Sequence, residues 1–497
     1  MILVTRFEQE LFDDLPRGFE NQPDKVSEAR WARTDELGKS WDYQRSGFFL
    51  GFLARRGIGR TEIEDRHILT CAGSRAGKGV SLVIPNLLLY QGSVLALDPK
   101  GELARLTKPE RERQGQRCFI IDPFNANRRF PSASYNPLIE IDPDPKSREA
   151  VDDADMIADA LVIPEGGENS HWTDTAKLLL RGLILLTLLM PEKERNLVTV
   201  RRLLMLSHPM LDAADEATEG TAGDEAGVKE LALFNTMAAR RDEFDGVLAA
   251  TGEAFLTMRP GERQNVISTA RTQTGFLDSK PLQDTLQGDS FRLADLKRGK
   301  VTVYLCLPAS RMATHAKWFR ILISLAMTVF EREEIKPSPP VLVVLEEFPV
   351  LGHLACIETA AGQIAGFGVK LWTILQDLTQ LQRHYKTSWE TFIGNAGTCT
   401  FFGNADLTTL KYVSEKLGAR GFKLIEPSKA GTAALLGGAS PIMENQRVDP
   451  LLAPHEFERL FARETWRMLV LVPGSYPVIV QRVNYRTDKA FAGMVED

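Results

Sequence analysis

One stretch of the sequence combines the residue types that bind phosphate groups. The stretch CAGSRAGKGVSL, residues 71–82, places Gly73, Gly77 and Lys78 between a strand-like run, HILTC, and a helical pattern, GVSLVIPNLLLY. In this strand–loop–helix order, successive backbone N–H groups and the start of a helix converge on an anion. Glycines let the backbone approach the phosphates, and the lysine reaches the outer ones. The stretch therefore predicts a phosphate-binding loop for ATP.

Two positions of this loop depart from the usual pattern. Ala72 replaces the first glycine, and Gly79 replaces the Ser or Thr whose hydroxyl binds Mg²⁺. A water molecule can take that coordination position, because Mg²⁺ usually keeps several waters, whereas Ser81 comes two residues too late. The alternative is a plain glycine-rich turn between a strand and a helix. The residues expected to bind the nucleotide are Gly73, Ser74, Arg75, Ala76, Gly77, Lys78, Gly79 and Val80.

Two adjacent acids follow another apolar run. In PPVLVVLEEFPVLGHL, residues 339–354, five apolar residues lead into Glu346 and Glu347. In P-loop ATPases such a strand lies beside the phosphate loop. We therefore expect Glu346 to hold Mg²⁺ through water and Glu347 to activate the water that attacks the γ-phosphate. Two solvated acids at a strand end are the alternative.

A third polar position follows the apolar run LWTIL. Gln376 stands where a strand tip would lie near the γ-phosphate, and it is a candidate sensor of the nucleotide state. The alternative is a polar residue that begins a helix. Lys78, Glu347 and Gln376 are thus the expected catalytic residues.

The elements that must position these residues alternate between strands and helices. Short apolar runs such as HILTC, SVLALD, KVTVYLCLP, VLVVLEEF and WRMLVLV are typical of strands buried on both faces of a parallel sheet. Helical patterns separate several of them, at residues 80–90, 316–332 and 407–417. Alternating strands and helices predict an α/β fold with helices on both faces of the sheet.

One long segment breaks this alternation. Residues 145–291 contain almost no strand-like run and carry apolar residues at i, i+3 and i+4. We therefore expect an inserted all-helical domain, in which the acidic run 212–227 is an exposed loop. The expected organisation is an N-terminal arm or cap at 1–46, the two parts of a nucleotide-binding domain at 47–144 and 292–497, and the helical domain at 145–291.

Composition and charge limit the class of protein. A chain of 497 residues suggests roughly two to four domains. The formal net charge of −6 argues weakly against a chain coated with nucleic acid, although a basic lining inside an acidic protein stays possible. The five cysteines form no C-x-x-C pair, which favours a reducing compartment. No run of about 18 apolar residues predicts a membrane span, and the apolar run at 178–190 predicts a buried helix.

An ordered set of further blocks resembles the TraG/TraD-type coupling proteins of type IV secretion and conjugation. DPKGEL, IDPFN and SYNPL follow the phosphate loop, and HWTDTAKLLLRGLILL resembles the start of that family's helical domain. TVYLCLPASRMATHAKWFRILISLA resembles the return to the sheet, and EEFPVLGHL, ILQDLTQLQRHY and TFFGNADLTTLKYVSEKLG complete the match. The resemblance covers residues 47–485, and family members often share the G-K-G of the phosphate loop.

The resemblance implies a RecA-like P-loop ATPase with a mainly parallel sheet and an inserted all-helical domain. It implies a hexamer of identical chains that uses ATP and Mg²⁺ to drive DNA, single- or double-stranded, into a type IV secretion channel. Relaxase or other secretion substrates would travel with the DNA. An ATP-gated receptor for secreted proteins is the alternative, and an FtsK-like pump fits the helical insertion and DPKGEL less well.

Two further expectations concern partners. Typical members carry N-terminal membrane helices, and none is evident here, so we expect a cytoplasmic protein held at the inner membrane by channel components or a separate membrane anchor. A ring ATPase also needs an arginine from a neighbouring subunit, because transition-state charge spreads over the γ-phosphate oxygens. The candidates are Arg75, Arg320, Arg383 and Arg447.

Overall fold

The computed structural model describes five stretches of the chain, residues 29–61, 66–163, 170–212, 225–427 and 442–495. The chain divides into two compact units, the first from residues 1–91, 347–349 and 370–496 and the second from residues 92–346 and 350–369. Most of the expected N-terminal arm and of the acidic run 212–227 lies outside the described residues. The domain boundaries predicted at 46, 144 and 291 differ from the unit borders and stay predictions.

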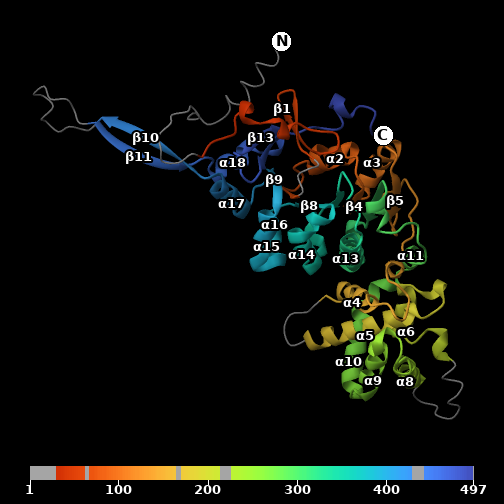
Figure 1. The fold of residues 1–497 in the computed structure, drawn as a ribbon. Helices are drawn as coiled ribbons and strands as arrows, with labels where there is room; N and C mark the ends of the chain where they lie inside the picture. Colours follow the sequence, from red (N-terminus) through yellow and green to blue (C-terminus); the bar gives the residue numbers. More distant parts are fainter. Residues whose placement is uncertain (1–28, 62–65, 164–169, 213–224, 428–441, 496–497) are drawn as a thin grey trace, which may run out of the picture. The chain divides into compact units, whose positions relative to one another are not determined.

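Parallel and antiparallel strands both occur in the first unit (Figure 1). They are ordered β2-β1-β13-β12-β9-β3-β8. Strand β3 runs parallel to both of its neighbours, β8 and β9, and the remaining pairs are antiparallel. The bounds are β1 (Phe48–Leu53), β2 (Arg56–Arg60), β3 (His67–Ala72), β8 (Val369–Leu375), β9 (Ala396–Phe402), β12 (Arg467–Leu471) and β13 (Val478–Gln481).

The antiparallel pairing of β12 and β13 follows from their short connection. Only residues 472–477 join the two strands, whereas a parallel crossover needs about a dozen residues or more. A continuous apolar run predicts burial on both faces, and it cannot by itself specify strand direction. A separate antiparallel pair, β10 (Ala419–Pro427) and β11 (Ile442–Pro450), was not predicted from the sequence.

Several helices of the first unit begin a few residues after a buried strand. A wide π-type turn, η3 (Gly79–Val83), continues into α2 (Ile84–Leu89), which matches the predicted helix at 80–90. Asp377 and Asp406 cap α15 and α17, each accepting a backbone N–H of the first turn. The helices of this unit also include α15 (Leu378–Tyr385), α16 (Glu390–Gly394), α17 (Leu407–Leu417) and α18 (Pro454–Leu460).

The sheet of the second unit is parallel throughout. Its strands are ordered β7-β4-β6-β5, and every residue of β4, β6 and β7 is buried. The bounds are β4 (Val94–Asp98), β5 (Arg117–Ile121), β6 (Val301–Cys306) and β7 (Val341–Leu345), with helices α3 (Glu102–Arg113), α13 (Ala309–Arg332) and α14 (Ala355–Gln363). Helix α13 begins seven residues before the predicted start at 316, because its first seven residues, ASRMATH, contain only one large apolar side chain.

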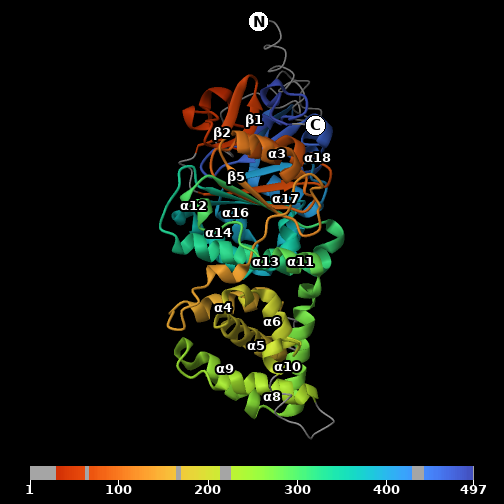
Figure 2. The same ribbon diagram turned by 90° about the vertical axis from the view of Figure 1, so that its right-hand side faces the viewer.

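Between β5 and β6 the described residues form helices and turns and no strand (Figure 2). Helix α5 contacts α4, α6, α9 and α10, and most of the apolar run at 178–190 is buried within it, although Leu178 is exposed and the helix ends at Leu188. This confirms the inserted all-helical region. Its helices are α4 (Ala150–Leu161), α5 (Ser170–Leu188), α6 (Leu197–Leu204), α8 (Glu225–Ala238), α9 (Val247–Thr257), α10 (Pro260–Gln273), α11 (Lys280–Thr285) and α12 (Asp295–Arg298).

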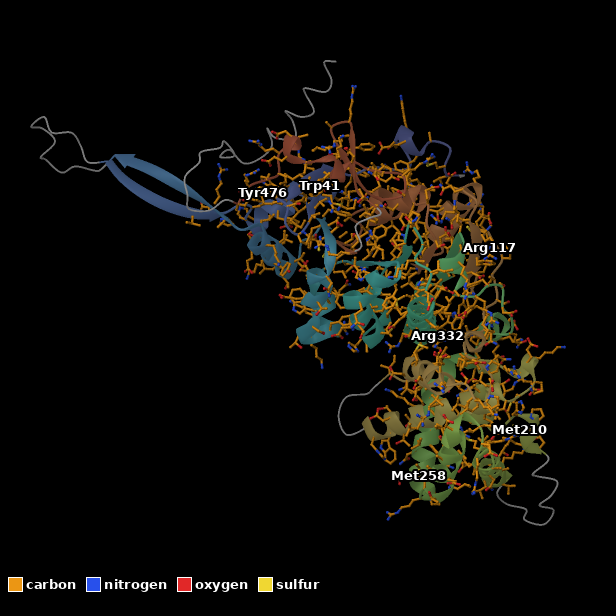
Figure 3. All side chains as sticks on the ribbon, in the orientation of Figure 1. Trp41, Arg117, Met210, Met258, Arg332 and Tyr476 are labelled. Atoms are coloured by element: carbon orange, nitrogen blue, oxygen red, sulfur yellow. The ribbon has the colours of Figure 1, made fainter. Side chains whose placement is uncertain are left out.

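Charged contacts join the helical region to helix α13 within the second unit. Arg332, at the end of α13, is labelled in Figure 3. Its guanidinium lies 2.8 Å from a carboxylate oxygen of Glu149 and 2.7 Å from one of Asp153. In the described part of the chain, no helix has the length and apolar character that would let it cross a bilayer.

Candidate active site

The phosphate loop connects β3 to η3, and two of its positions require glycine. A Cβ atom at Gly73 would lie 1.8 Å from the carbonyl oxygen of Gly403. Gly77 has a φ of 91°, a left-handed conformation that other residues rarely adopt. The backbone of the loop therefore has no room for a side chain at Gly73 and favours glycine at Gly77.

The two departures from the usual pattern have different structural consequences. Ala72 ends β3 with its side chain buried, so its methyl group belongs to the core. At Gly79 a Cβ would meet no atom within 4 Å, so packing does not demand glycine there. The hydroxyl of Ser81 donates to the carbonyl of Gly77 at 2.8 Å and is buried, which keeps it inside the turn.

The other predicted binding residues, Ser74, Arg75, Ala76 and Val80, lie in the same loop and in the turn that follows it. Ser74 and Arg75 are exposed, and Arg75 has a left-handed φ of 56°. Ala76 is buried, and its amide donates to the carbonyl of Gly73 at 3.1 Å. Val80 is half-buried in η3. Their role in binding a nucleotide stays a prediction.

Lys78, Glu347 and Gln376 come together, although 269 residues separate the first two. The Lys78 ammonium donates to Oε1 of Glu347 at 2.8 Å, and the Gln376 amide donates to Oε2 at 3.1 Å. The side chains of Lys78 and Glu347 are 14% and 24% exposed, so a ligand can reach both. Glu347 has a left-handed φ of 58°, and such backbone strain clusters at active sites. The arrangement can hold an anion beside a carboxylate.

The sequence interpretation missed Asn404, which supports this site. Asn404 is buried, and its amide donates to the backbone carbonyl of Gln376 at 3.0 Å and to the Cys71 sulfur at 3.4 Å. The Gln376 amide N–H donates to the side chain of Gln380 at 2.9 Å. The signal was available, since Asn404 follows a buried strand just as Gln376 does.

Glu346, the predicted metal-supporting acid, follows β7 in the second unit and is half-buried. Among the described residues, no cluster of three or more His, Cys, Asp or Glu side chains could hold a metal ion. Such a cluster is not required by the prediction, because a magnesium ion bound to phosphates needs few protein ligands. The role of Glu346 stays a prediction.

The candidate arginines occupy different environments. Arg320 is buried, and its guanidinium donates to the carbonyls of Leu351 and His353 at 2.8 and 2.7 Å. It is therefore engaged within its own chain. Arg75 and Arg383 are exposed, and the side chain of Arg447 lies outside the described residues.

Arg482 is a second residue that the sequence interpretation missed, and it contacts the backbone of the phosphate loop. Its side chain is buried, and it donates to the carbonyl of Ala76 at 2.7 Å and to that of Arg463 at 2.9 Å. The guanidinium carbon lies 4.4 Å from the ring centre of Phe402. A polar residue directly after the apolar strand run YPVIVQ was the available signal.

Two carboxylates of the second unit also end parallel strands, but they face inward. Asp98, from DPKGEL, is buried and accepts the Ala104 amide at 2.8 Å. Asp122, from IDPFN, accepts the amides of Ala126 and Asn127, both at 2.8 Å, and the side chain of Asn127 at 2.7 Å. Both acids therefore fasten the turn that follows their strand.

The sequence matches one family over nearly its whole length. A sequence profile described as type IV secretory system conjugative DNA transfer matches residues 13–496. The chain is similar to protein VirD4 of Rhizobium radiobacter, with 27% identity over 482 residues, which covers 94% of this chain and 65% of that protein. It is similar to the conjugal transfer protein TraG of Escherichia coli, with 29% identity over 443 residues, 83% of this chain and 66% of that protein. The chain thus spans 65% and 66% of the length of these curated relatives.

Solved structures share the fold. The plasmid coupling protein TrwB in complex with a non-hydrolysable GTP analogue superposes with a TM-score of 0.63 at 15% identity, covering 96% of this chain and 100% of that one. TrwB in complex with ADP and Mg²⁺ gives a TM-score of 0.63 at 14% identity, covering 94% and 96%. This likeness confirms the predicted RecA-like α/β fold.

Proposed function

The chain belongs to the type IV secretory system conjugative DNA transfer family, and from this membership we propose that it is an ATP-hydrolysing coupling protein. In this proposal it delivers DNA, single- or double-stranded, to a type IV secretion channel, together with relaxase or other secretion substrates. The contact of Lys78 with Glu347 carries the proposal, because it sets a phosphate-binding cation beside a carboxylate that can activate water.

The geometry supports a specific division of labour. ATP phosphates bind the amides between Gly73 and Val80, and the γ-phosphate competes with Glu347 for the Lys78 ammonium. The Glu347 carboxylate, held by Gln376, then accepts a proton from the attacking water. Water bonds to the γ-phosphorus, and the bridging oxygen leaves with ADP.

A metal ion belongs to the same proposal. When bound, Mg²⁺ neutralises charge on the β- and γ-phosphate oxygens. Gly79 provides no hydroxyl for it, so water molecules would complete its shell, one of them held by Glu346. The nucleotides present in the TrwB structures, including ADP with Mg²⁺, support this use of the shared fold.

The proposal includes a ring of identical chains, predicted as a hexamer. Arg75 and Arg383 are exposed, so either is able to contact a nucleotide bound to a neighbouring chain. Channel components or a separate membrane anchor would hold the ring at the membrane.

The test is the substitution Lys78→Ala, with Lys100→Ala as its control. Lys100 is an exposed lysine outside residues 73–80, so its loss changes the net charge by the same amount and leaves the loop's own residues unchanged. We expect Lys78→Ala to lower ATP affinity by about a hundredfold or more, since a charge-assisted donor to phosphate is lost. The control should bind ATP as the unchanged protein does.

The same preparation tests the substrate. ATP hydrolysis should rise when DNA is added and should rise more than linearly with protein concentration, as expected for a ring. Unchanged ATP affinity in Lys78→Ala would contradict the nucleotide site. An ATP hydrolysis rate that does not change when DNA is added, together with tight binding of a secreted protein, would contradict DNA delivery and favour the ATP-gated receptor.

A further inference from the structure

A recess lies beside the phosphate loop within the first unit. It has a volume of about 180 Å³, and its lining residues are Ala76, Gly77, Val80, Arg463, Trp466, Arg482, Asn484 and Arg486. A larger hollow of about 600 Å³ shares Trp466, Arg482 and Asn484 with it. The phosphate loop and the chain flanking β12 and β13 therefore form walls of one recess.

Hydrogen bonds fix these walls to each other. Arg482 donates to the Ala76 carbonyl at 2.7 Å, and the Tyr485 amide approaches the Val80 carbonyl at 3.5 Å. Burial lowers the pKa of Arg482 to about 10, so its guanidinium remains charged at neutral pH. The recess is thus attached to the backbone that would hold the phosphates.

Trp466 gives the recess an aromatic surface. Its backbone φ is 55°, which is rare for a bulky residue and persists only where the surroundings determine it. Its carbonyl accepts the Arg482 amide at 2.7 Å, and the Arg482 guanidinium lies 5.3 Å from its ring centre. The indole is half-buried and lines the recess.

We propose that this recess binds the purine base and ribose of the nucleotide, with the base stacked on Trp466. The inference rests on the proposed function, because the phosphates must occupy the loop for the base to reach the recess. Gly77 and Val80 line the recess and also border the phosphate position, so one nucleotide can span both. Stacking does not depend on the edge of the base, so ATP and GTP should bind with similar affinity.

The experiment measures the affinities of ATP, GTP and inorganic tripolyphosphate for the full chain and its variants. Trp466→Ala should weaken ATP and GTP by about tenfold or more and leave tripolyphosphate unchanged. Trp466→Phe keeps an aromatic face and should retain most of the affinity. Asn484→Tyr places a ring in the recess from another wall and should weaken ATP selectively. The Lys78→Ala variant should show greatly weakened binding of all three ligands.

The outcomes separate the two proposals. One outcome is that the Lys78→Ala variant no longer binds the ligands while the Trp466→Ala and Asn484→Tyr variants bind ATP with normal affinity. In that case the base does not occupy this recess, and the proposed phosphate site is retained. An equal loss of ATP and tripolyphosphate in both recess variants also overturns the inference, because the residues then support the loop alone. If the unchanged protein binds neither ligand, the proposed function is overturned together with the inference.

Discussion

Acids at or shortly after the carboxyl ends of parallel strands have different roles in the two units. In the first unit, Glu347 turns toward Lys78 and Gln376 and stays accessible. In the second unit, Asp98 and Asp122 are buried and accept backbone amides of the turns that follow them. All three residues are carboxylic acids at or within two residues of the end of a parallel strand. The direction of the side chain decides whether the acid faces a ligand or fastens a loop.

The largest effect should come from the accessible acid. Glu347→Gln removes the proton acceptor and keeps a side chain of equal size, so ATP hydrolysis should slow by about 10²- to 10⁴-fold while ATP affinity is retained. Thermal unfolding should change little, because the side chain is partly exposed. Single-turnover hydrolysis and ATP binding measure the two quantities, and normal turnover would remove Glu347 from the catalytic role.

The buried acid of the other region should show the opposite pattern. Asp122→Ala leaves the amides of Ala126 and Asn127 without their acceptor, so the free energy of unfolding should fall by about 3 kcal/mol. ATP affinity of the folded protein should not change. Unfolding by denaturant measures the loss of unfolding free energy. If Asp122→Ala keeps its full stability but loses ATP binding, the structural role given to Asp122 is contradicted.

Two glycines test how tightly the phosphate loop is specified. Gly73→Ala forces its methyl group against the Gly403 carbonyl, and overpacking of about 1–3 kcal/mol should weaken ATP binding correspondingly. Gly79→Ala is the matched control, because its added methyl group meets no atom within 4 Å. Equal effects of the two substitutions on ATP affinity would show that the contact with Gly403 does not position the loop.

The smallest effect concerns pH. Burial raises the pKa of Asp98 to about 6 from its usual 3.8, so the folded state holds the proton more tightly than the unfolded state does. Its contribution to stability is therefore fullest below pH 3.8 and is lost as the pH rises through about 6.

Asp98→Asn should remove this dependence. Relative to the unchanged protein, the variant should gain about 2 kcal/mol of unfolding free energy between roughly pH 4.5 and pH 7. Unfolding by denaturant at the two pH values measures this difference. If the unfolding free energies of the two proteins change equally with pH, the raised pKa of Asp98 is contradicted.

Local patterns singled out three residues that the structure brings together, Lys78, Glu347 and Gln376. The phosphate loop, the acid pair and Gln376 each follow a buried strand in a short stretch of sequence, and helix α17 occupies residues 407–417, as its periodicity indicated. Helix α13 was predicted too short because periodicity gives no signal in its first seven residues, which contain only one large apolar side chain.

Contacts between distant stretches could not be predicted in the same way. Arg482 reaches the loop across 406 residues, and Asn404 reaches Cys71 across 333. Their roles depend on the order of strands in the sheet, which no local pattern encodes. The left-handed backbone of Glu347 is likewise set by the surrounding chain and not by its own residue type.

The hydrogen bond from Gln376 to Glu347 links the phosphate loop to a surface helix. Gln376 also donates its backbone N–H to Gln380, which lies within α15, and that helix carries the exposed Arg383. A shift of the Glu347 carboxylate is therefore connected to α15 through the side chains of Gln376 and Gln380. In the proposed enzyme, release of the terminal phosphate would therefore change the hydrogen bonds at the first turn of this exposed helix.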